Sequence, residues 1–349
     1  MGRRVLVTGL ASFWGGRVAK ALELDPSVET IVGLDTREPT VELQRTEFVR
    51  SDESYSILTR IVRATQVDTI LHTFLVVDST EASPRRIHET NVIGTMNLLA
   101  AAGAPGSPVR HIVVKSSALV YGASPHDPTW FGEGATRSRP ARTAVERSLL
   151  EAESYLADFA EDNPEVAVAV LRFANVLGSE IQTPISRALD LPVVPCVLGF
   201  DPLLQFVHED DVVRAIDFVM QRGLSGVANV AADGRLPWSE VAAIAGKARF
   251  FLPPILTAQA GAALARLRIV DLPPELLALL RYGRGVDNER LKQAGFRYGF
   301  STAGAVESFA RSRRQRAAAG DTVVPYRYER DVEQFFRHSA AAARSPEDP

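Results

Sequence analysis

The residues Arg4-Val-Leu-Val-Thr-Gly-Leu-Ala-Ser-Phe-Trp-Gly-Gly-Arg-Val-Ala-Lys-Ala-Leu22 set the architecture of the chain. An apolar run of strand type, Val5 to Val7, is ended by Thr8-Gly9, and apolar residues then recur at helical spacing up to Leu22. This pattern predicts a strand, a tight turn and a helix. A helix that begins directly after a glycine turn presents unpaired N–H groups and the positive end of its dipole, which suit a dinucleotide pyrophosphate.

The glycines of this turn match part of the fingerprint of dinucleotide-binding folds. Gly9 is expected to make the turn, and Gly15 is expected to let the helix pack closely on the strand. Ser12 stands where the middle glycine of the fingerprint is usual. The motif therefore needs support from a second element.

A second strand, Thr30 to Leu34, supplies that support because it ends at Asp35. Asp35 lies 20 residues after Gly15, the spacing expected for an acid that binds the adenosine ribose. This carboxylate favours NAD over NADP. Arg37 leaves NADP open, since a guanidinium at that position can hold a 2′-phosphate.

The composition places few restrictions on function but excludes some classes. With 349 residues and 46% apolar content, the chain is long enough for one large α/β domain or two joined ones. A net charge of −3 gives no general attraction to nucleic acid or anionic membranes. Cys196 is the only cysteine, which fits a reducing, cytoplasmic environment, and Met1 to Val5 leads directly into the first strand without room for a signal peptide. Phe250 to Leu280 is interrupted by prolines and charges, so it is a poor candidate for a membrane span.

Strand and helix patterns alternate along the first half of the chain. The expected elements are a strand over 47–52, a helix over 57–62, a strand over 67–74, a helix that opens at Asn91 and a strand over 110–117. This alternation predicts a parallel sheet that is covered on both faces, with ligands at the carboxyl ends of its strands.

A series of motifs follows in a fixed order and spacing. They are Thr8-Gly9 with Gly15, Asp35, Asp52, His72, Asn91-Val92-x-Gly94-Thr95, Ser116-Ser-Ala-Leu-Val-Tyr-Gly122, Leu171-Arg-Phe-Ala-Asn-Val-Leu-Gly178, Phe206-Val-His-Glu-Asp-Asp211 and Arg284-Gly-Val-Asp287. The series resembles the extended short-chain dehydrogenase/reductases, and within them the NAD-dependent epimerase/dehydratase branch that includes UDP-glucose 4-epimerase. The resemblance covers roughly residues 4 to 310.

The resemblance implies a Rossmann-like, doubly wound parallel sheet in residues 1–170, to which segments near 171–180 and 200–230 return. A smaller C-terminal substrate-capping region over 180–315 and a tail over 316–349 would follow. The implied activity is that of an NAD-dependent, or NADP-dependent, epimerase, dehydratase or oxidoreductase. Its substrate would be a small molecule, such as a nucleotide sugar, and the protein would be a homodimer. No nucleic acid, membrane or metal is expected at the site.

The resemblance also assigns roles to individual residues. Ser117 would orient the substrate, with Asn175 and Arg284 as further substrate contacts, and His72 would be a buried, hydrogen-bonded histidine in the cofactor floor rather than a catalyst. The positions implied to contact the cofactor are Gly9, Ser12, Phe13, Trp14, Gly15, Asp35, Thr36, Arg37, Asp52, Glu53, His72, Thr73, Phe74, Asn91, Ser116 and Arg147.

The pattern fails at the pair on which the family's chemistry rests, Tyr-x-x-x-Lys. In this register Thr143 stands at the tyrosine position and Arg147 at the lysine position. An arginine is always charged and only donates hydrogen bonds, and a threonine hydroxyl is far too weak an acid to replace a tuned phenol. The chain has no tyrosine between Tyr121 and Tyr155, so the loss does not depend on the alignment.

Four side chains are alternatives for proton transfer: Lys115, Tyr121, and the acids Asp127 and Glu133 in the loop that follows. Lys115 projects to the same face of its strand as Ser117 and would lose its proton readily if it were buried, and Tyr121 follows shortly after. Leu204 replaces an arginine that usually binds the diphosphate of a nucleotide sugar, which leaves Arg284 for that task or indicates a less charged substrate. Two hypotheses remain open: an enzyme with non-standard catalytic residues, and a catalytically inactive NAD(P)-binding sensor or scaffold.

Overall fold

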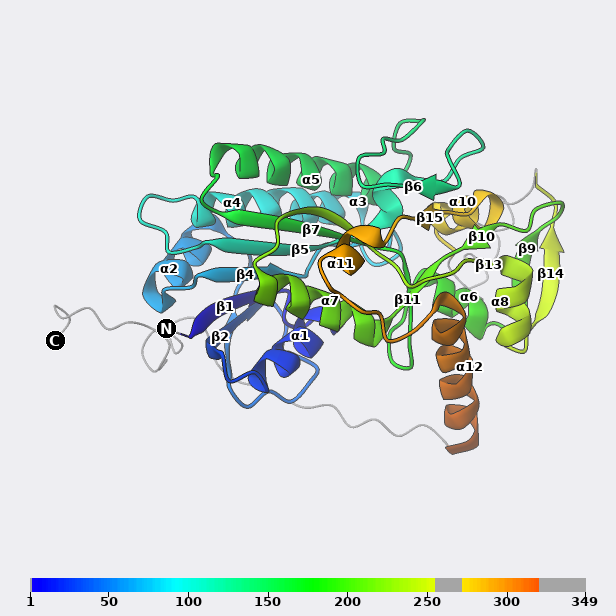
Figure 1. Cartoon of the computed structure of the whole chain (residues 1–349), viewed down its shortest axis with the longest axis horizontal. Coiled ribbons are helices and arrows are strands. Elements are labelled where there is room, and N and C mark those ends of the chain that lie inside the picture. The colour runs from blue at the N-terminus through cyan, green and yellow to red at the C-terminus, as the bar shows by residue number, and fades with distance from the viewer. Residues whose placement is uncertain (1, 255–271, 320–349) are drawn as a thin grey trace.

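The computed structural model describes residues 2–254 and 272–319. Its centre is a parallel sheet of seven strands in the order β12-β7-β5-β4-β1-β2-β3 (Figure 1). The strands are β1 (Arg3–Thr8), β2 (Val28–Asp35), β3 (Thr46–Arg50), β4 (Thr69–His72), β5 (His111–Ser117), β7 (Ala167–Phe173) and β12 (Gly226–Val230). The order reverses between β1 and β4, which makes the sheet doubly wound. The predicted fold class is therefore confirmed.

Helices cover both faces of the sheet because residues along each strand alternate between two apolar cores. On one face pack α2 (Tyr55–Thr65), α4 (Gly94–Ala102) and α5 (Ala144–Asp162). On the other face pack α1 (Phe13–Glu23) and α7 (Glu209–Arg222). In β1, for example, Leu6 belongs to the first core and Val5 and Val7 belong to the second. Strands that are buried on both faces explain the continuous apolar runs in the sequence.

The helix that was expected to open at Asn91 begins earlier, so that prediction is wrong. Helix α3 (Pro84–His88) continues through a π-helical turn (Glu89–Ile93) into α4. The true start is set by Ser83, whose hydroxyl accepts a hydrogen bond from the Arg86 N–H, and by the proline at the first helical position. Asn91 lies inside the π-helical turn.

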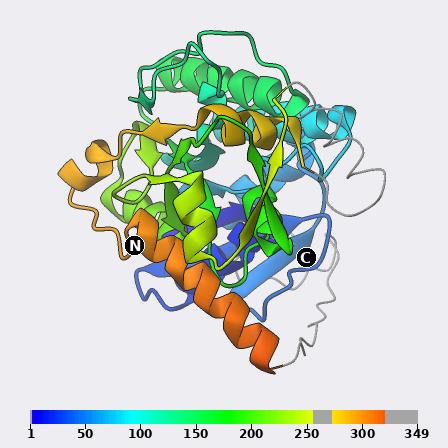
Figure 2. The same cartoon turned by 90° about the vertical axis from the view of Figure 1, so that its right-hand side faces the viewer.

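Smaller elements assemble beside the carboxyl ends of the central strands (Figure 2). Four two-stranded pairs form there: β8 (Asn175–Leu177) with β11 (Phe206–His208), β9 (Val193–Val197) with β14 (Ala248–Leu252), β10 (Leu203–Leu204) with β13 (Leu236–Pro237), and β6 (Trp130–Phe131) with β15 (Gly285–Val286). The helices of this part are α6 (Pro184–Asp190), α8 (Trp238–Ile244), α10 (Pro274–Tyr282), α11 (Glu289–Gln293) and α12 (Thr302–Ala319). Trp238, Phe206 and Phe309 are the large side chains of its core.

Some predicted segments fall partly outside the described residues. Of Phe250 to Leu280, the end of β14 and most of α10 are described, and 255–271 are not; of the tail over 316–349, residues 320–349 are not. The basic run Arg311 to Arg316 lies on α12, where Arg313 pairs with Asp190 at 2.8 Å. None of the helices within 2–254 and 272–319 is long and apolar enough to cross a membrane.

Candidate functional site: a dinucleotide turn beside a substrate pocket

The glycine turn has the geometry that the sequence predicts. Gly9 has a φ of +75°, a conformation that side chains rarely adopt. A Cβ on Gly15 would lie 2.1 Å from the Gly9 carbonyl oxygen, so only glycine permits this approach of helix to strand. Ser12 caps α1, because its hydroxyl accepts a hydrogen bond from the Gly15 N–H at 3.0 Å. The serine at the middle position of the fingerprint thus stabilises the helix that follows.

Asp35 joins the second strand to the glycine turn. It is buried, and its two carboxylate oxygens accept hydrogen bonds from the Ala11 N–H at 2.9 Å and the Arg37 N–H at 3.0 Å. The side chains of Thr36 and Arg37 are exposed beside it. A buried carboxylate fixed at the carboxyl end of β2, next to a capped helix N-terminus, fits a dinucleotide that lies across this edge.

The floor beside the turn is fully hydrogen bonded. His72 is completely buried, with Nδ1 at 3.0 Å from the Thr8 hydroxyl and Nε2 at 3.0 Å from the Thr95 hydroxyl. Burial lowers the pKa of His72 to about 3, so the ring is neutral near pH 7. The interpretation of His72 as a buried, hydrogen-bonded histidine is confirmed. Phe74 packs its ring edge-on against His72 at 4.1 Å between centroids.

The other residues that the resemblance assigns to the cofactor differ in their burial and in their hydrogen bonds. Asn91 is buried and binds the backbone of Val76 through its carboxamide, with 2.7 Å to the N–H and 2.8 Å to the carbonyl. Asp52 is exposed and Glu53 is half-buried, both in the loop after β3, where burial raises the pKa of Glu53. Thr73 donates a hydrogen bond to the Thr8 carbonyl at 2.8 Å. Contact of these side chains with NAD stays a prediction.

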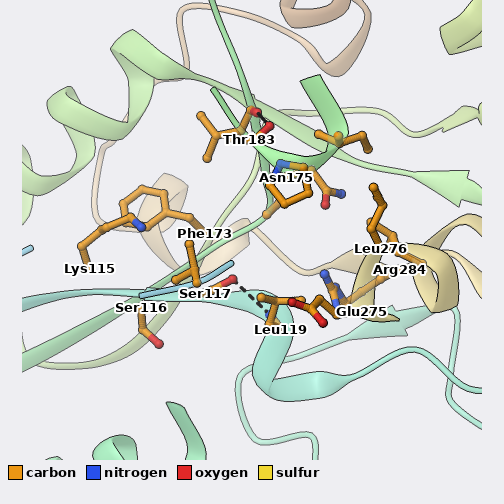
Figure 3. A pocket seen from close by; sticks show the side chains of 16 residues that line it. Lys115, Ser116, Ser117, Leu119, Phe173, Asn175, Thr183, Glu275, Leu276 and Arg284 are labelled. Carbon is orange, nitrogen blue, oxygen red and sulfur yellow. Dashed lines mark hydrogen bonds between the residues drawn. The ribbon is translucent and has the colours of Figure 1, made fainter. Parts of the chain in front are cut away.

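A pocket opens where β5 and β7 end and β8 begins, and residues of α6 and α10 also line it (Figure 3). Three predicted substrate residues meet in it: Ser117, Asn175 and Arg284. The Ser117 hydroxyl accepts a hydrogen bond from the Leu119 N–H at 3.2 Å, which leaves its own proton for a ligand. The walls are mainly apolar, and their apolar members are Val77, Leu119, Phe173, Ala174, Val176, Pro184, Ile185, Leu276 and Leu279.

Arg284 carries a positive charge into this apolar pocket. Only 6% of its surface is exposed, and one guanidinium nitrogen donates a hydrogen bond to the Gly122 carbonyl at 3.0 Å. Burial lowers its pKa to about 10, so the guanidinium is still charged at pH 7. It forms no salt bridge within the described ranges, and such a group is suited to a bound anion. Leu204 is fully buried and forms a backbone bridge to Arg284.

Sequence reasoning missed Glu275 in the first turn of α10. This side chain lines the pocket and is buried, and one of its oxygens accepts a hydrogen bond from the Ser79 N–H at 3.1 Å. The other oxygen has no hydrogen-bond partner in the part of the chain that is described. Burial raises the pKa of the carboxyl. The sequence held one signal, because Glu275 shares a helical face with the buried Leu279.

Thr143 and Arg147 lie apart from the pocket residues. Thr143 is the N-cap of α5, and its hydroxyl accepts from the Glu146 N–H at 3.2 Å while the Glu146 carboxylate accepts from the Thr143 N–H at 3.3 Å. Arg147 is exposed and donates to the Arg142 carbonyl at 3.1 Å. Neither residue lines the pocket that contains Ser117.

The side chains of Tyr121 and Ser116 are both engaged in hydrogen bonds to other side chains, and their assigned roles stay predictions. The Tyr121 hydroxyl is buried between Asn229, to which it donates at 2.8 Å, and Arg172, from which it accepts at 2.8 Å, and burial raises its pKa. Ser116 projects to the opposite face of β5, where its hydroxyl donates to Glu153 at 2.5 Å (Figure 3). These side chains belong to a buried polar network that joins β5 to α5 and β7. Lys115, in contrast, lines the pocket with Ser117, as strand alternation predicts.

Comparisons with known proteins agree with this geometry. An uncharacterized protein of Mycobacterium tuberculosis and one of Mycobacterium bovis are each 32% identical over 319 residues, which cover 88% of this chain and 84% of the relative. Solved structures with the same fold include MoeE5 in complex with UDP-glucuronic acid and NAD, with a TM-score of 0.68, 21% identity, and 89% and 99% of the two chains covered. The UDP-glucose 4-epimerase of Thermotoga maritima with UDP-glucose also has a TM-score of 0.68, at 20% identity and coverage of 90% and 99%.

The family is identified by a match to the sequence itself. The pattern of the NAD dependent epimerase/dehydratase family matches residues 5–231, which include the glycine turn, Asp35, the strand end at Ser117 and the segment through Asn175. More than half of the chain is therefore accounted for. The protein belongs to the NAD dependent epimerase/dehydratase family, whose cofactor is NAD.

Proposed function

We propose that this protein uses NAD to exchange hydride with a carbinol or carbonyl carbon of a small molecule, and that it does so without the Tyr-x-x-x-Lys pair of its family. The substrate is a nucleotide sugar or a related hydroxylated compound. One observation carries the proposal: Ser117 and Arg284 share a pocket at the carboxyl end of the sheet that also carries the dinucleotide turn. When bound, NAD supplies the hydride acceptor, and the chain supplies binding, orientation and proton transfer.

The pocket side chains divide these tasks. Ser117 offers a hydroxyl proton to a substrate oxygen, and Arg284 offers guanidinium donors to an anionic group. Their apolar surroundings exclude water, which strengthens both interactions. Because Leu204 adds no second arginine, we expect weaker binding of a diphosphate than two arginines would give.

The positions of Thr143 and Arg147 favour a second candidate, a cofactor-binding protein without redox turnover. The Thr143 hydroxyl is engaged in a capping box, and Arg147 is exposed outside the pocket. If no other group replaced the tyrosine, the protein would hold NAD as a sensor or scaffold.

One experiment separates the two candidates. The purified protein is denatured, and the released dinucleotide and its redox state are identified. The native protein loaded with NAD is then mixed with UDP-glucose, UDP-glucuronic acid, dTDP-glucose and simple alcohols, while absorbance is followed at the reduced nicotinamide band. Reduction of NAD by any of them supports the enzyme. Bound NAD that stays oxidised across the whole panel supports the sensor or scaffold.

We also propose that the protein is a homodimer. The support is an apolar surface on and beside α4, where Ile93 is 42% exposed and Met96 is 40% exposed. Sedimentation analysis of the protein and of Met96→Glu tests this proposal. We expect a dimer that the variant weakens, and a monomeric parent protein would overturn it.

A further inference from the structure

Lys115 differs from every other lysine of this chain. The sequence has four lysines, Lys20, Lys115, Lys247 and Lys292, and its other basic residues are arginines or histidines. Of the four lysines, only Lys115 is buried, with 4% of its surface exposed. It lies on β5, two residues before Ser117, and both side chains line the pocket.

The ammonium group of Lys115 has no carboxylate partner at contact distance among residues 2–254 and 272–319. Within these ranges Lys115 forms neither a hydrogen bond nor a salt bridge. Its Nζ lies 5.6 Å from the centroid of the Trp14 ring. Arg172, the half-buried cation on the adjacent strand, is instead bound to Glu153 at 2.6 Å. A buried cation with no counter-ion at contact distance is costly, so its retention in a pocket indicates a ligand or a reaction.

Lys115 lies between the dinucleotide turn and the substrate pocket. Trp14 lies in the first turn of α1, directly after the dinucleotide turn, whereas Ser117 lies in the substrate pocket. Residues two apart on a strand are about 7 Å from each other and face the same side. In Figure 3, Ser117 stands between Lys115 on one side of the view and Glu275 and Arg284 on the other. A substrate hydroxyl bound at Ser117 is therefore within the span of the lysine side chain.

We propose that Lys115 is the proton-transfer residue of this pocket, in place of the missing tyrosine. This inference rests on the proposed function. The neutral Lys115 amine accepts the proton of the substrate hydroxyl as the C–H bond at the same carbon gives its hydride to the cofactor. The products are a carbonyl, a reduced cofactor and an ammonium on Lys115. In the reverse direction the ammonium returns the proton to the alkoxide oxygen.

The electrostatic surroundings support this role. Burial lowers the pKa of Lys115 to about 8, and the charge of Glu81, in the loop after β4, opposes the shift. The other charged groups that line the pocket are Glu275 on α10 and Arg284 before β15. A base with a pKa close to the working pH is the most effective proton carrier, and arginine cannot take that part.

Competitive labelling of the four lysines tests the amine itself without any substrate. The full-length protein with its bound NAD is treated with trace acetic anhydride between pH 6 and pH 11, and acetylation of each lysine is followed by mass spectrometry. We expect Lys115 to react with a midpoint near pH 8, about two units below the ordinary value of a lysine, and the other three lysines are labelled alongside it as internal references. A midpoint near pH 10, or no reaction at Lys115 at any pH, would overturn the proposal.

Hydride transfer tests the role of the amine. Lys115→Met removes the amine but keeps a side chain of similar length, so we expect it to fold with undiminished stability. With a compound that reduces bound NAD in the parent, the variant should be slower by roughly 10²- to 10⁴-fold. The rise of the parent rate with pH around 8 should also disappear. Lys115→Arg should be equally slow because its guanidinium does not deprotonate, whereas Lys247→Met should match the parent.

The outcomes separate this inference from the proposed function. Equal rates in the parent and Lys115→Met would overturn the role of Lys115 alone. A parent protein that never changes the redox state of NAD, with Lys115 still labelled near pH 8, would overturn the proposed function and the role built on it.

Discussion

The floor beneath the dinucleotide turn and the pocket next to it treat buried polar groups in opposite ways. In the floor, His72 has a partner at both ring nitrogens, and both oxygens of Asp35 accept a backbone hydrogen bond. In the pocket, Lys115 has no hydrogen bond or salt bridge within the described ranges, and one oxygen of Glu275 is equally unpartnered there. Buried polar groups are normally satisfied, because an unsatisfied one costs about 1–3 kcal/mol. The hydrogen bonds of the floor thus stabilise the fold, whereas the pocket contains polar groups for which the described residues supply no partner.

The largest expected effect is that of a substitution at Gly15, beside the dinucleotide turn. Gly15→Ala places a methyl group 2.1 Å from the Gly9 carbonyl, so α1 must move away from the turn. We expect a loss of about 3 kcal/mol or more in the free energy of unfolding, at the upper end of overpacking, and at least a tenfold loss in NAD affinity. Chemical denaturation and calorimetric titration measure the two. Gly132→Ala is the matched control, since a Cβ there meets no atom within 4 Å. Wild-type affinity in Gly15→Ala would contradict this account of the turn.

A second effect follows from the burial of His72. The unfolded chain takes up a proton on this ring near its ordinary pKa of 6.5, whereas the folded protein does so only near 3. The stability that depends on neutral His72 is thus complete above pH 6.5 and is lost as the pH falls toward 3. Between pH 6 and pH 4 the loss from this one group is about 2 kcal/mol.

His72→Gln tests that contribution, because glutamine can both donate and accept a hydrogen bond but does not titrate. We expect its free energy of unfolding to fall by about 2 kcal/mol less than that of the parent between pH 6 and pH 4. His88→Gln, the same substitution at an exposed site, is the matched control. Identical slopes for the parent and His72→Gln would mean that His72 takes up its proton in the folded state.

The sequence predicted the floor better than the pocket because the floor is encoded locally. Gly9, Gly15 and Asp35 lie within the first strand–helix–strand unit, and their roles follow from spacing. Strand alternation likewise placed Lys115 and Ser117 on one face. Glu275 reaches the pocket only when α10 takes its place in the folded chain, and its helical spacing with Leu279 indicates burial but not which pocket it lines. The start of the helix before Asn91 was locally encoded by Ser83 and Pro84, so this error came from following the motif instead of the cap.

The third effect is that of a substitution at Asp35 on the affinity for NAD. Asp35→Ala removes the carboxylate that is predicted to bind the adenosine ribose, and we expect NAD affinity to fall at least tenfold, which corresponds to about 1.4 kcal/mol. Asp35→Asn keeps an acceptor for the Ala11 N–H, so it separates binding of ribose from support of the turn. Isothermal titration with NAD and NADP gives both affinities. Unchanged NAD affinity in Asp35→Ala would refute the assignment of this carboxylate.

The smallest expected effect is that of a substitution at Glu275, in the pocket. Burial raises the pKa of Glu275, so as the pH rises above about 4.5 the unfolded chain releases this proton before the folded protein does. The stability that Glu275 contributes is therefore present in full at low pH and is lost as the pH rises through its folded pKa. Glu275→Gln keeps an acceptor for the Ser79 N–H and cannot ionise.

We expect Glu275→Gln to be at least as stable as the parent at pH 8, by less than about 1 kcal/mol, with no gain at pH 4. Denaturant unfolding at the two pH values measures the difference, and Glu240→Gln, in the exposed first turn of α8, is the control. A variant that loses stability at both pH values would show that Glu275, like His72 and Asp35, stabilises the fold. A stable variant with altered ligand binding would place it with Lys115, among the groups that the fold leaves free for chemistry.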